Sequence, residues 1–265
     1  WAGTPQGAWW FEDGSWHPLQ ALAGRDVRGV LWRGGGEAWW STYGDGLFRL
    51  QDGGGSKGIQ GRINDAGMVY MAHILEDREG TVWAACDQGL VQIRQGRVRM
   101  VDQRDGLPGR TVWSALEDDR GAFWMGTEGG LARMDRQGQV RVWGREQGLS
   151  HPFVRSLCQD ERRWGRGLWV GTTLGLQHLT ESGFQTHKLA EGEGLEPMVR
   201  VIRPDGRGGL WLGTSEGLMH LHPASGRVDR ISREEHIPGR VVRAILPDGR
   251  GGLWLGTDNG LVLRR

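Results

Sequence analysis

The fold of this chain is decided by the segment Gly252-Leu-Trp-Leu-Gly-Thr257, because its Trp-x-Gly-Thr ending recurs along the whole sequence. Seven such tetrapeptides occur, some with substitutions after the tryptophan, and they begin at Trp1, Trp39, Trp83, Trp124, Trp169, Trp211 and Trp254. Successive tryptophans lie 38, 44, 41, 45, 42 and 43 residues apart. A period of about 40–45 residues with strand-like content is the signature of a propeller with one four-stranded blade per repeat.

We therefore predict an all-β fold, a seven-bladed β-propeller of four-stranded antiparallel blades. In the last repeat, residues 241–246 form a first strand, residues 252–257 a second, and residues 261–263 begin a third. Earlier repeats add a fourth strand, for example at residues 97–101. The Trp1 repeat lacks the first strand and the Trp254 repeat lacks the fourth, so the first and last blades are predicted to be incomplete. Because the repeat covers the chain, we predict a single domain spanning residues 1–265.

Four positions of the repeat have a mechanical interpretation. The turn between the first two strands carries an aspartate that accepts hydrogen bonds from its own backbone, and a glycine three residues before the Trp of most repeats closes that turn. The Trp fills the space between neighbouring blades. The Gly of Trp-x-Gly-Thr lets the next blade approach closely. We interpret these recurring positions as scaffold; the aspartates are Asp77, Asp118, Asp205 and Asp248, and Arg33 stands at the corresponding position of the Trp39 repeat.

Composition narrows the function classes. The formal net charge is +1, so no bulk electrostatic field favours binding to nucleic acid or to an anionic membrane. No apolar run reaches the roughly 18 residues of a membrane span, and we predict no membrane insertion by this chain. Cys86 and Cys158 fall in different repeats, which predicts neither a disulfide nor a zinc site made from them. The chain begins without Met and shows no signal peptide, which says little about its compartment.

A fixed frame recurs in the later repeats. Val154-Arg-Ser-Leu157 is followed by Asp160, by Gly167-Leu-Trp-Val-Gly-Thr172 and by Gly175-Leu176, and the frame returns at residues 199–218 and 242–261. It resembles the two-component regulator propeller repeat, and residues 106–110 and 148–152 look like that family's loops between blades. The resemblance implies a seven-bladed propeller of a bacterial sensor, periplasmic or extracellular in location. Many members of that family sense oligosaccharides.

The mouth of the central channel is the place where a propeller offers a ligand site. The residue five positions before the turn aspartate, near the start of the innermost strand, is an arginine in most repeats, and Trp113 and Ala72 take the place in two others. Arginine's planar fork suits carboxylates, sulfates and phosphates, and a Trp can stack on a sugar face. The predicted ligand-binding residues are Arg28, Trp113, Arg155, Arg200 and Arg243, with Arg25, Arg110 and Arg240 in a second layer three residues earlier.

A structural role competes with this interpretation, because the arginines can pair with acids of nearby loops. Those acids include Asp26, Glu146, Glu193 and Glu235. His73 lies on the same type of strand, where a packed or water-bonded histidine is the plainer interpretation. The partner predicted for the arginines is an oligosaccharide or another small anionic ligand, with a protein partner as the alternative.

Three function classes remain open. The first is a non-catalytic ligand-binding sensor. The second is a protein–protein interaction scaffold, to which Trp164 and its Arg-rich turn at residues 160–167 would contribute. The third is a lyase or hydrolase, since streptogramin lyases also use seven-bladed propellers. No residues stand out as catalytic, and we predict no cofactor and no metal site, His220 and His222 being the one histidine pair with a spacing that a metal could use.

Overall fold

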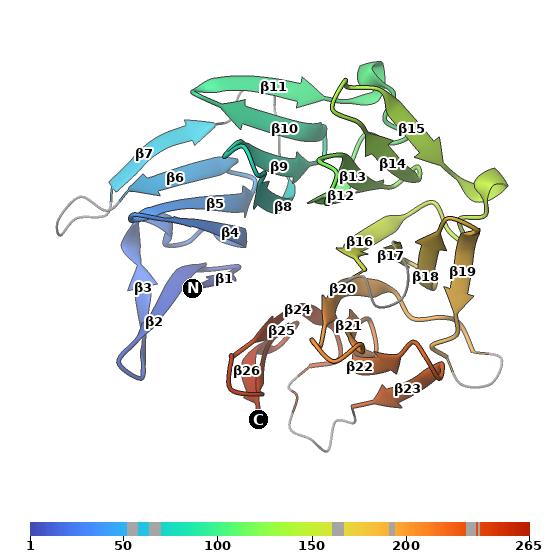
Figure 1. Ribbon diagram of the computed structural model, residues 1–265. Coiled ribbons are helices and arrows are strands. Elements are labelled where there is room, and N and C mark those ends of the chain that lie inside the picture. Colours follow the sequence, from blue (N-terminus) through green and yellow to red (C-terminus); the bar gives the residue numbers. More distant parts are fainter. Residues whose placement is uncertain (52–57, 64–69, 161–166, 191–193, 232–236, 238) are drawn as a thin grey trace. The chain divides into compact units, whose positions relative to one another are not determined.

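The structure is a computed structural model, and it describes residues 1–265 except 52–57, 64–69, 161–166, 191–193, 232–236 and 238. The described residues form seven sheets, which we number as blades 1 to 7 in chain order (Figure 1). The helices among them are single turns of three residues: η1 (Gln20–Leu22), η2 (Gln103–Asp105) and η3 (Arg145–Gln147). The predicted all-β fold is confirmed.

Contacts group the chain into two compact units, one of Trp1–Phe123 with Met134–Val140 and one of Trp124–Arg133 with Arg141–Arg265. The first unit contains blades 1 to 3, made of β1 (Ala2–Thr4), β2 (Gly7–Glu12), β3 (Ser15–Leu19), β4 (Asp26–Gly34), β5 (Glu37–Tyr43), β6 (Leu47–Gln51), β7 (Gly58–Ile63), β8 (Met71–Glu76), β9 (Val82–Cys86), β10 (Gly89–Arg94) and β11 (Arg97–Val101).

The strands of blade 4 fall in both units and are β12 (Val112–Glu117), β13 (Phe123–Thr127), β14 (Leu131–Met134) and β15 (Val140–Trp143). The second unit contains blades 5 to 7, made of β16 (Val154–Gln159), β17 (Leu168–Thr172), β18 (Gly175–Thr180), β19 (Gly183–His187), β20 (Val199–Pro204), β21 (Leu210–Thr214), β22 (Gly217–His222), β23 (Arg227–Arg230), β24 (Val242–Pro247), β25 (Leu253–Thr257) and β26 (Gly260–Arg264).

The strand order confirms the blade count and the incomplete ends. Each sheet follows the chain order of its strands, as in an up-and-down meander. Blades 1 and 7 have three strands in the described residues, and the other five blades have four. The single domain expected for residues 1–265 stays a prediction.

The turn aspartates behave as the sequence predicts. The Oδ1 atom of Asp205 accepts hydrogen bonds from the backbone N–H of Arg207 at 2.6 Å and of Gly209 at 2.8 Å. Asp77, Asp118 and Asp248 make the same pair of bonds in their own turns. Each turn thereby satisfies backbone donors that no strand can reach.

The glycine of the motif allows neighbouring blades to approach closely. A Cβ placed on Gly171 would lie 2.9 Å from the carbonyl oxygen of Val199 in the next blade, and one on Gly213 would lie 2.9 Å from that of Val242. Real Cβ atoms do not approach backbone oxygen this closely, so a side chain at either position would push the first strand of the following blade away.

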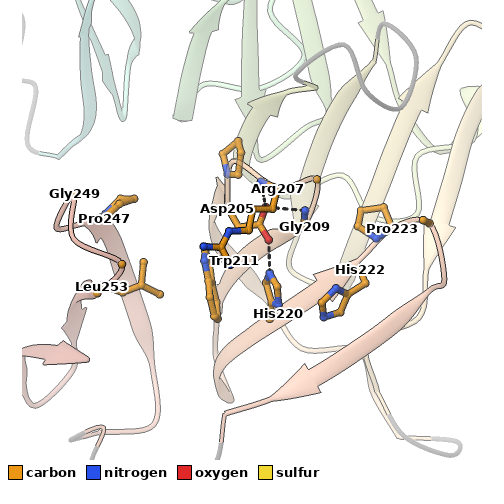
Figure 2. A pocket seen from close by; sticks show the side chains of 15 residues that line it. Asp205, Arg207, Gly209, Trp211, His220, His222, Pro223, Pro247, Gly249 and Leu253 are labelled. Carbon is orange, nitrogen blue, oxygen red and sulfur yellow. Dashed lines mark hydrogen bonds and ion pairs between the residues drawn. The ribbon is translucent and has the colours of Figure 1, made fainter. Parts of the chain in front are cut away.

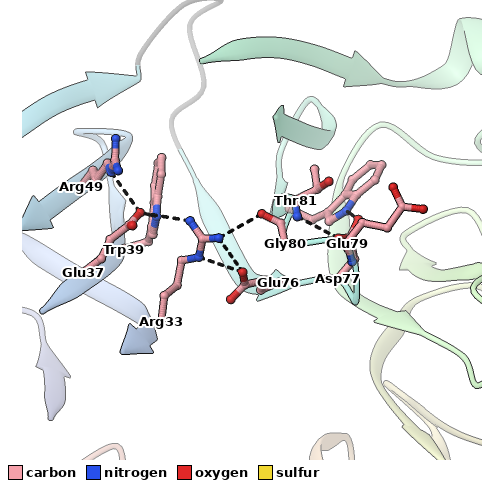
Figure 3. Close-up of polar contacts among 10 residues, drawn as sticks. Arg33, Glu37, Trp39, Arg49, Glu76, Asp77, Glu79, Gly80 and Thr81 are labelled. Atoms are coloured by element: carbon pink, nitrogen blue, oxygen red, sulfur yellow. Dashed lines mark hydrogen bonds and ion pairs between the residues drawn. The ribbon is translucent and has the colours of Figure 1, made fainter. Parts of the chain in front are cut away.

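The departure at Arg33 has a structural reason, which Figure 3 shows. In place of a turn aspartate, Arg33 reaches from blade 2 to blade 3 and donates from Nε at 2.9 Å and from Nη2 at 2.6 Å to Glu76. Its Nη1 lies 3.2 Å from Glu37, which also accepts bonds from Trp39 and Arg49. Partial burial alone would raise the pKa of Glu37, but the hydrogen bonds from Arg49 and Trp39 outweigh it and lower that pKa.

Both cysteines are free thiols in the structure, Cys86 buried and Cys158 half-buried. Burial raises the pKa of the Cys86 thiol to about 11. Among the described residues, no helix has the length and apolar character that crossing a membrane requires.

Candidate functional site

The predicted ligand-binding position coincides with a β-bulge in the first strand of the blade. In blade 5 the pairing of β16 with β17 shifts register between Val154 and Ser156, which leaves Arg155 as the extra residue. The same shift occurs at Arg28 in β4, Arg200 in β20, Arg243 in β24 and Ala72 in β8. A bulge leaves one residue outside the ladder and re-aims its side chain, and bulges concentrate at rims and functional sites. His73 directly follows the bulge in β8.

In the first unit, the exposed Arg28 lies beside a run of aromatic side chains. Its guanidinium carbon is 5.8 Å from the ring centroid of Tyr43, which ends β5 and is 49% exposed. The Tyr43 ring meets Tyr70 edge to face with centroids 5.8 Å apart, and Tyr70 meets Trp113 of β12 in the same way at 5.3 Å. Arg28 also forms a 2.5 Å ion pair with Asp26. We call Arg28, Tyr43, Tyr70 and Trp113 the aromatic rim.

Two second-layer arginines of this unit have protein partners. Arg25 pairs with Asp45 at 2.8 Å and lies 4.8 Å from the ring centroid of Phe48. Arg110 donates from Nε to the side-chain oxygen of Gln88 at 2.9 Å. These contacts support the structural interpretation, in which the arginines pair with side chains of the protein. The ion pair of Arg28 with Asp26 supports it in part as well.

The second unit holds the other predicted residues. Arg155 and Arg200 are half-buried on β16 and β20, and Arg243 is exposed on β24. The pKa of Asp258 is lowered chiefly by a hydrogen bond from the Val241 backbone, and the positive charge of Arg243 lowers it further. Arg240 is exposed and lies 3.9 Å from Glu216. The acids Glu193 and Glu235 and the aromatic Trp164, named as partners or contact residues, lie outside the described residues.

The structure brings Arg28 and Trp113 into one group through two residues that the sequence argument missed, Tyr43 and Tyr70. The chain has 2 tyrosines, and both belong to the aromatic rim. Tyr43 follows the Trp-Trp-Ser-Thr motif directly, and Tyr70 precedes the first strand of blade 3. The sequence signal that could have indicated this group was the placement of both tyrosines at the same edge of two successive blades.

A separate pocket of about 650 Å³ lies between blades 6 and 7 of the second unit, as Figure 2 shows. Blade 6 lines it with Asp205, Trp211, His220, His222 and Pro223, and blade 7 with Pro247, Gly249 and Leu253. His220 stacks on Trp211 with ring centroids 4.2 Å apart, and its Nε2 lies 2.9 Å from Asp205 Oδ2.

The outer wall of this pocket continues into a second acid–imidazole pair. His222 Nε2 lies 2.9 Å from Oδ2 of Asp229 on β23, and Arg227 Nη2 is 2.8 Å from the same oxygen. The hydrogen bond from His222 is the main reason that the pKa of Asp229 is lowered. Partial burial acts to raise the pKa of Asp205, but hydrogen bonds from Arg207, Gly209 and His220 outweigh it and lower that pKa. Both carboxylates are therefore anionic at neutral pH.

The comparisons with known proteins agree with the repeat and the fold. Residues 106–129 and 236–259 match the family model described as "Two component regulator propeller", so the chain carries repeats of this kind, as its sequence resemblance predicted. No curated protein sequence matches the chain.

Solved structures resemble the whole chain. The extracellular domain of the putative hybrid two component system BT3049 from B. thetaiotaomicron is 20% identical with a TM-score of 0.83 over 99% of this chain and 37% of its own. The extracellular domain of the putative one component system BT4673 from B. thetaiotaomicron is 21% identical, with a TM-score of 0.72 over 90% of this chain and 32% of its own. The chain thus spans about a third of the length of these extracellular domains. A catalytically inactive virginiamycin B lyase from Staphylococcus aureus with quinupristin is 14% identical with a TM-score of 0.72 over 94% and 83%.

At these identities the likeness shows the fold. The chain is an all-β seven-bladed propeller, and its repeats are of the two-component regulator type.

Proposed function

We propose that this chain is the non-catalytic, ligand-binding propeller of an extracytoplasmic sensor, and that it recognises an oligosaccharide carrying acidic groups at the aromatic rim. The observation that carries the proposal is the contact of the bulged, exposed Arg28 with a run of three aromatic rings from successive blades. The extracellular domains that resemble the chain support the location and the sensor class.

The chemistry of the rim suits such a ligand. A guanidinium has five N–H donors in a planar fork that fits a carboxylate or sulfate, and the bond to Asp26 uses one of them. The exposed ring of Tyr43 and the half-buried rings of Tyr70 and Trp113 offer flat apolar faces, which match the C–H face of a sugar ring, and a tyrosine hydroxyl can bond the sugar hydroxyls. The half-buried Arg155 and Arg200 and the exposed Arg243 stand at equivalent bulges of the second unit.

The test is a thermal-shift screen against neutral and acidic oligosaccharides, followed by calorimetric titration of those that stabilise the protein. A ligand at about 100 times its dissociation constant adds about 2.7 kcal/mol of stability, which raises the melting temperature by a few degrees. We expect acidic oligosaccharides alone to do so. Arg28→Ala and Tyr43→Ala should each weaken binding about tenfold, equivalent to about 1.4 kcal/mol.

Arg97→Ala is the matched control, since Arg97 is an exposed arginine on β11 away from the rim. Binding that is unchanged in Arg28→Ala and Tyr43→Ala would refute the rim as the site. A flat response to the whole panel, from a protein that melts cooperatively, would instead favour the protein-interaction scaffold.

A further inference from the structure

Two histidines and an aspartate converge on one face of blade 6. His220 of β22 and Asp229 of β23 are direct cross-strand partners, so their side chains project side by side. His222 lies two residues further along the same strand and therefore on the same face. One potential ligand atom from each of these three side chains lies within 4.8 Å of the others. His222 Nε2 and Asp229 Oδ2 are already 2.9 Å apart.

The surroundings hold one of these ligands in place. Asp205 lies 2.9 Å from His220 Nε2, and Trp211 stacks on the ring of His220 (Figure 2). A carboxylate bonded to one imidazole nitrogen fixes the tautomer and leaves the lone pair on the other, here Nδ1. This carboxylate–histidine arrangement is the usual support of a metal-bound histidine.

We propose that His220, His222 and Asp229 form a binding site for a divalent cation of the zinc class, with Asp205 as the residue that positions His220. Two imidazole nitrogens and one carboxylate oxygen are ligands that Zn²⁺ accepts in tetrahedral sites with an open fourth position. Bonds of about 2.1 Å place tetrahedral ligand atoms roughly 3.4 Å apart, so small side-chain rotations close the site. His220 and His222 both line the 650 Å³ pocket, from which a water or a small anion can reach the fourth position.

Arg227 occupies the neighbourhood of this site as a competing cation. Its Nη2 lies 3.1 Å from His222 Nε2 and 2.8 Å from Asp229 Oδ2. The Arg227 side chain is 65% exposed and can turn away into solvent when a metal binds. Removing its charge should therefore strengthen metal binding, an effect that a purely structural hydrogen-bond cluster would not produce.

The experiment is calorimetric titration of the tag-free, EDTA-treated chain with ZnCl₂, with CoCl₂ absorbance as the reporter of geometry. We expect saturable binding of a single zinc ion per chain and a tetrahedral cobalt spectrum. His222→Ala and Asp229→Ala should weaken zinc binding by more than about tenfold, because even changes beyond the ligands cost about 10–100-fold. Asp205→Asn should also weaken zinc binding by about tenfold or more, because Asp205 positions the ligand His220. Arg227→Ala should tighten it by roughly two- to fivefold, as expected from losing an exposed ion pair.

His17→Ala is the control, because His17 is a half-exposed histidine of blade 1. Zinc affinity should be the same in this variant and in the unaltered chain. Far-UV circular dichroism and the melting temperature without metal check that each variant is folded. The proposal is overturned if the unaltered chain binds no zinc, or if His222→Ala and Asp229→Ala bind zinc as tightly as the unaltered chain does.

Discussion

Blades 5 and 6 contain the same three side chains, a tryptophan, a histidine across from it and the turn aspartate, but they use them differently. In blade 5, Trp169 is 1% exposed and stacks at 4.1 Å on His178, which lies 3.2 Å from Asp160. In blade 6, Trp211 is half-buried, and the side chains of His220 and Asp205 are 14% and 11% exposed beside the pocket.

The neighbouring blade explains the difference. Trp169 packs among Ile202, Leu210 and Leu212 of blade 6, which is four-stranded. Trp211 packs at the edge of a smaller cluster formed with blade 7, which has three strands in the described residues. The same three side chains are therefore part of the core in blade 5, where the next sheet covers them. In blade 6, where the next sheet covers less, they form the wall of a pocket.

The largest expected effect separates the two tryptophans by stability. Trp169→Ala should lower the free energy of unfolding by about 3–5 kcal/mol, the cost of a cavity left by a buried aromatic ring. Trp211→Ala should cost at least about 1 kcal/mol less, because part of that ring already faces the pocket. Urea denaturation followed by far-UV circular dichroism measures both. Equal losses would show that the pocket face of Trp211 is in fact well packed.

The sequence predicted the scaffold because its determinants are local and periodic. Asp205 and its turn, Gly213 and the blade count depend on contacts within a few residues or on a spacing repeated in each blade. The arginines could be aligned with one another for the same reason, since they occupy one position of the repeat, where the bulge recurs.

The contacts that define the candidate sites depend instead on pairings between strands or blades that do not repeat along the chain. Tyr43 and Tyr70 meet across two blades, with 26 residues between them in the sequence. The placement of Asp229 opposite His220 follows from the length of the turn between β22 and β23. Neither relation is periodic, so the repeat could not reveal it.

The next effect separates the two blades by pH. Burial, with a smaller effect of the neighbouring His187, lowers the pKa of His178 to about 4 from its ordinary value of 6.5. His178 is thus neutral at pH 7, and its contact with Asp160 is not an ion pair. Between these pH values the unfolded chain binds a proton that the folded chain does not. The free energy of unfolding therefore falls as the pH drops through this range, by roughly 2–3 kcal/mol from this group.

Replacing the histidine isolates its share of the pH dependence. His178→Gln should lose less stability than the unaltered chain between about pH 7 and pH 4.5, as measured by urea midpoints across that range. Gln185→Ala is the control, because Gln185 is the exposed, non-titrating cross-strand neighbour of His178. The comparison between chains cancels the acid sensitivity of the turn aspartates. Parallel pH profiles for His178→Gln and the unaltered chain would contradict the assignment.

The smallest effect compares the two glycines that touch the histidines. A Cβ on Gly167 would collide with His178 Nε2 and lie 2.9 Å from the backbone oxygen of Leu179, whereas one on Gly209 meets the side chains of Asp205 and, at 2.6 Å, His220 Nε2. Backbone cannot yield, whereas the side chains of Asp205 and His220, which border the pocket, can shift slightly toward it. Gly167→Ala should therefore cost about 1–3 kcal/mol, and Gly209→Ala distinctly less.

Urea denaturation of the two alanine variants tests this order. Neither glycine has a positive φ, so the substitution adds steric contact and no backbone strain. Because the yielding side chains in blade 6 are those of the proposed cation site, Gly209→Ala should also disturb zinc binding while Gly167→Ala leaves it unchanged. A larger loss of stability in Gly209→Ala than in Gly167→Ala would mean that His220 and Asp205 are held as rigidly as their buried counterparts His178 and Asp160. The pocket wall of blade 6 would then be as tightly packed as the core, although it is partly exposed.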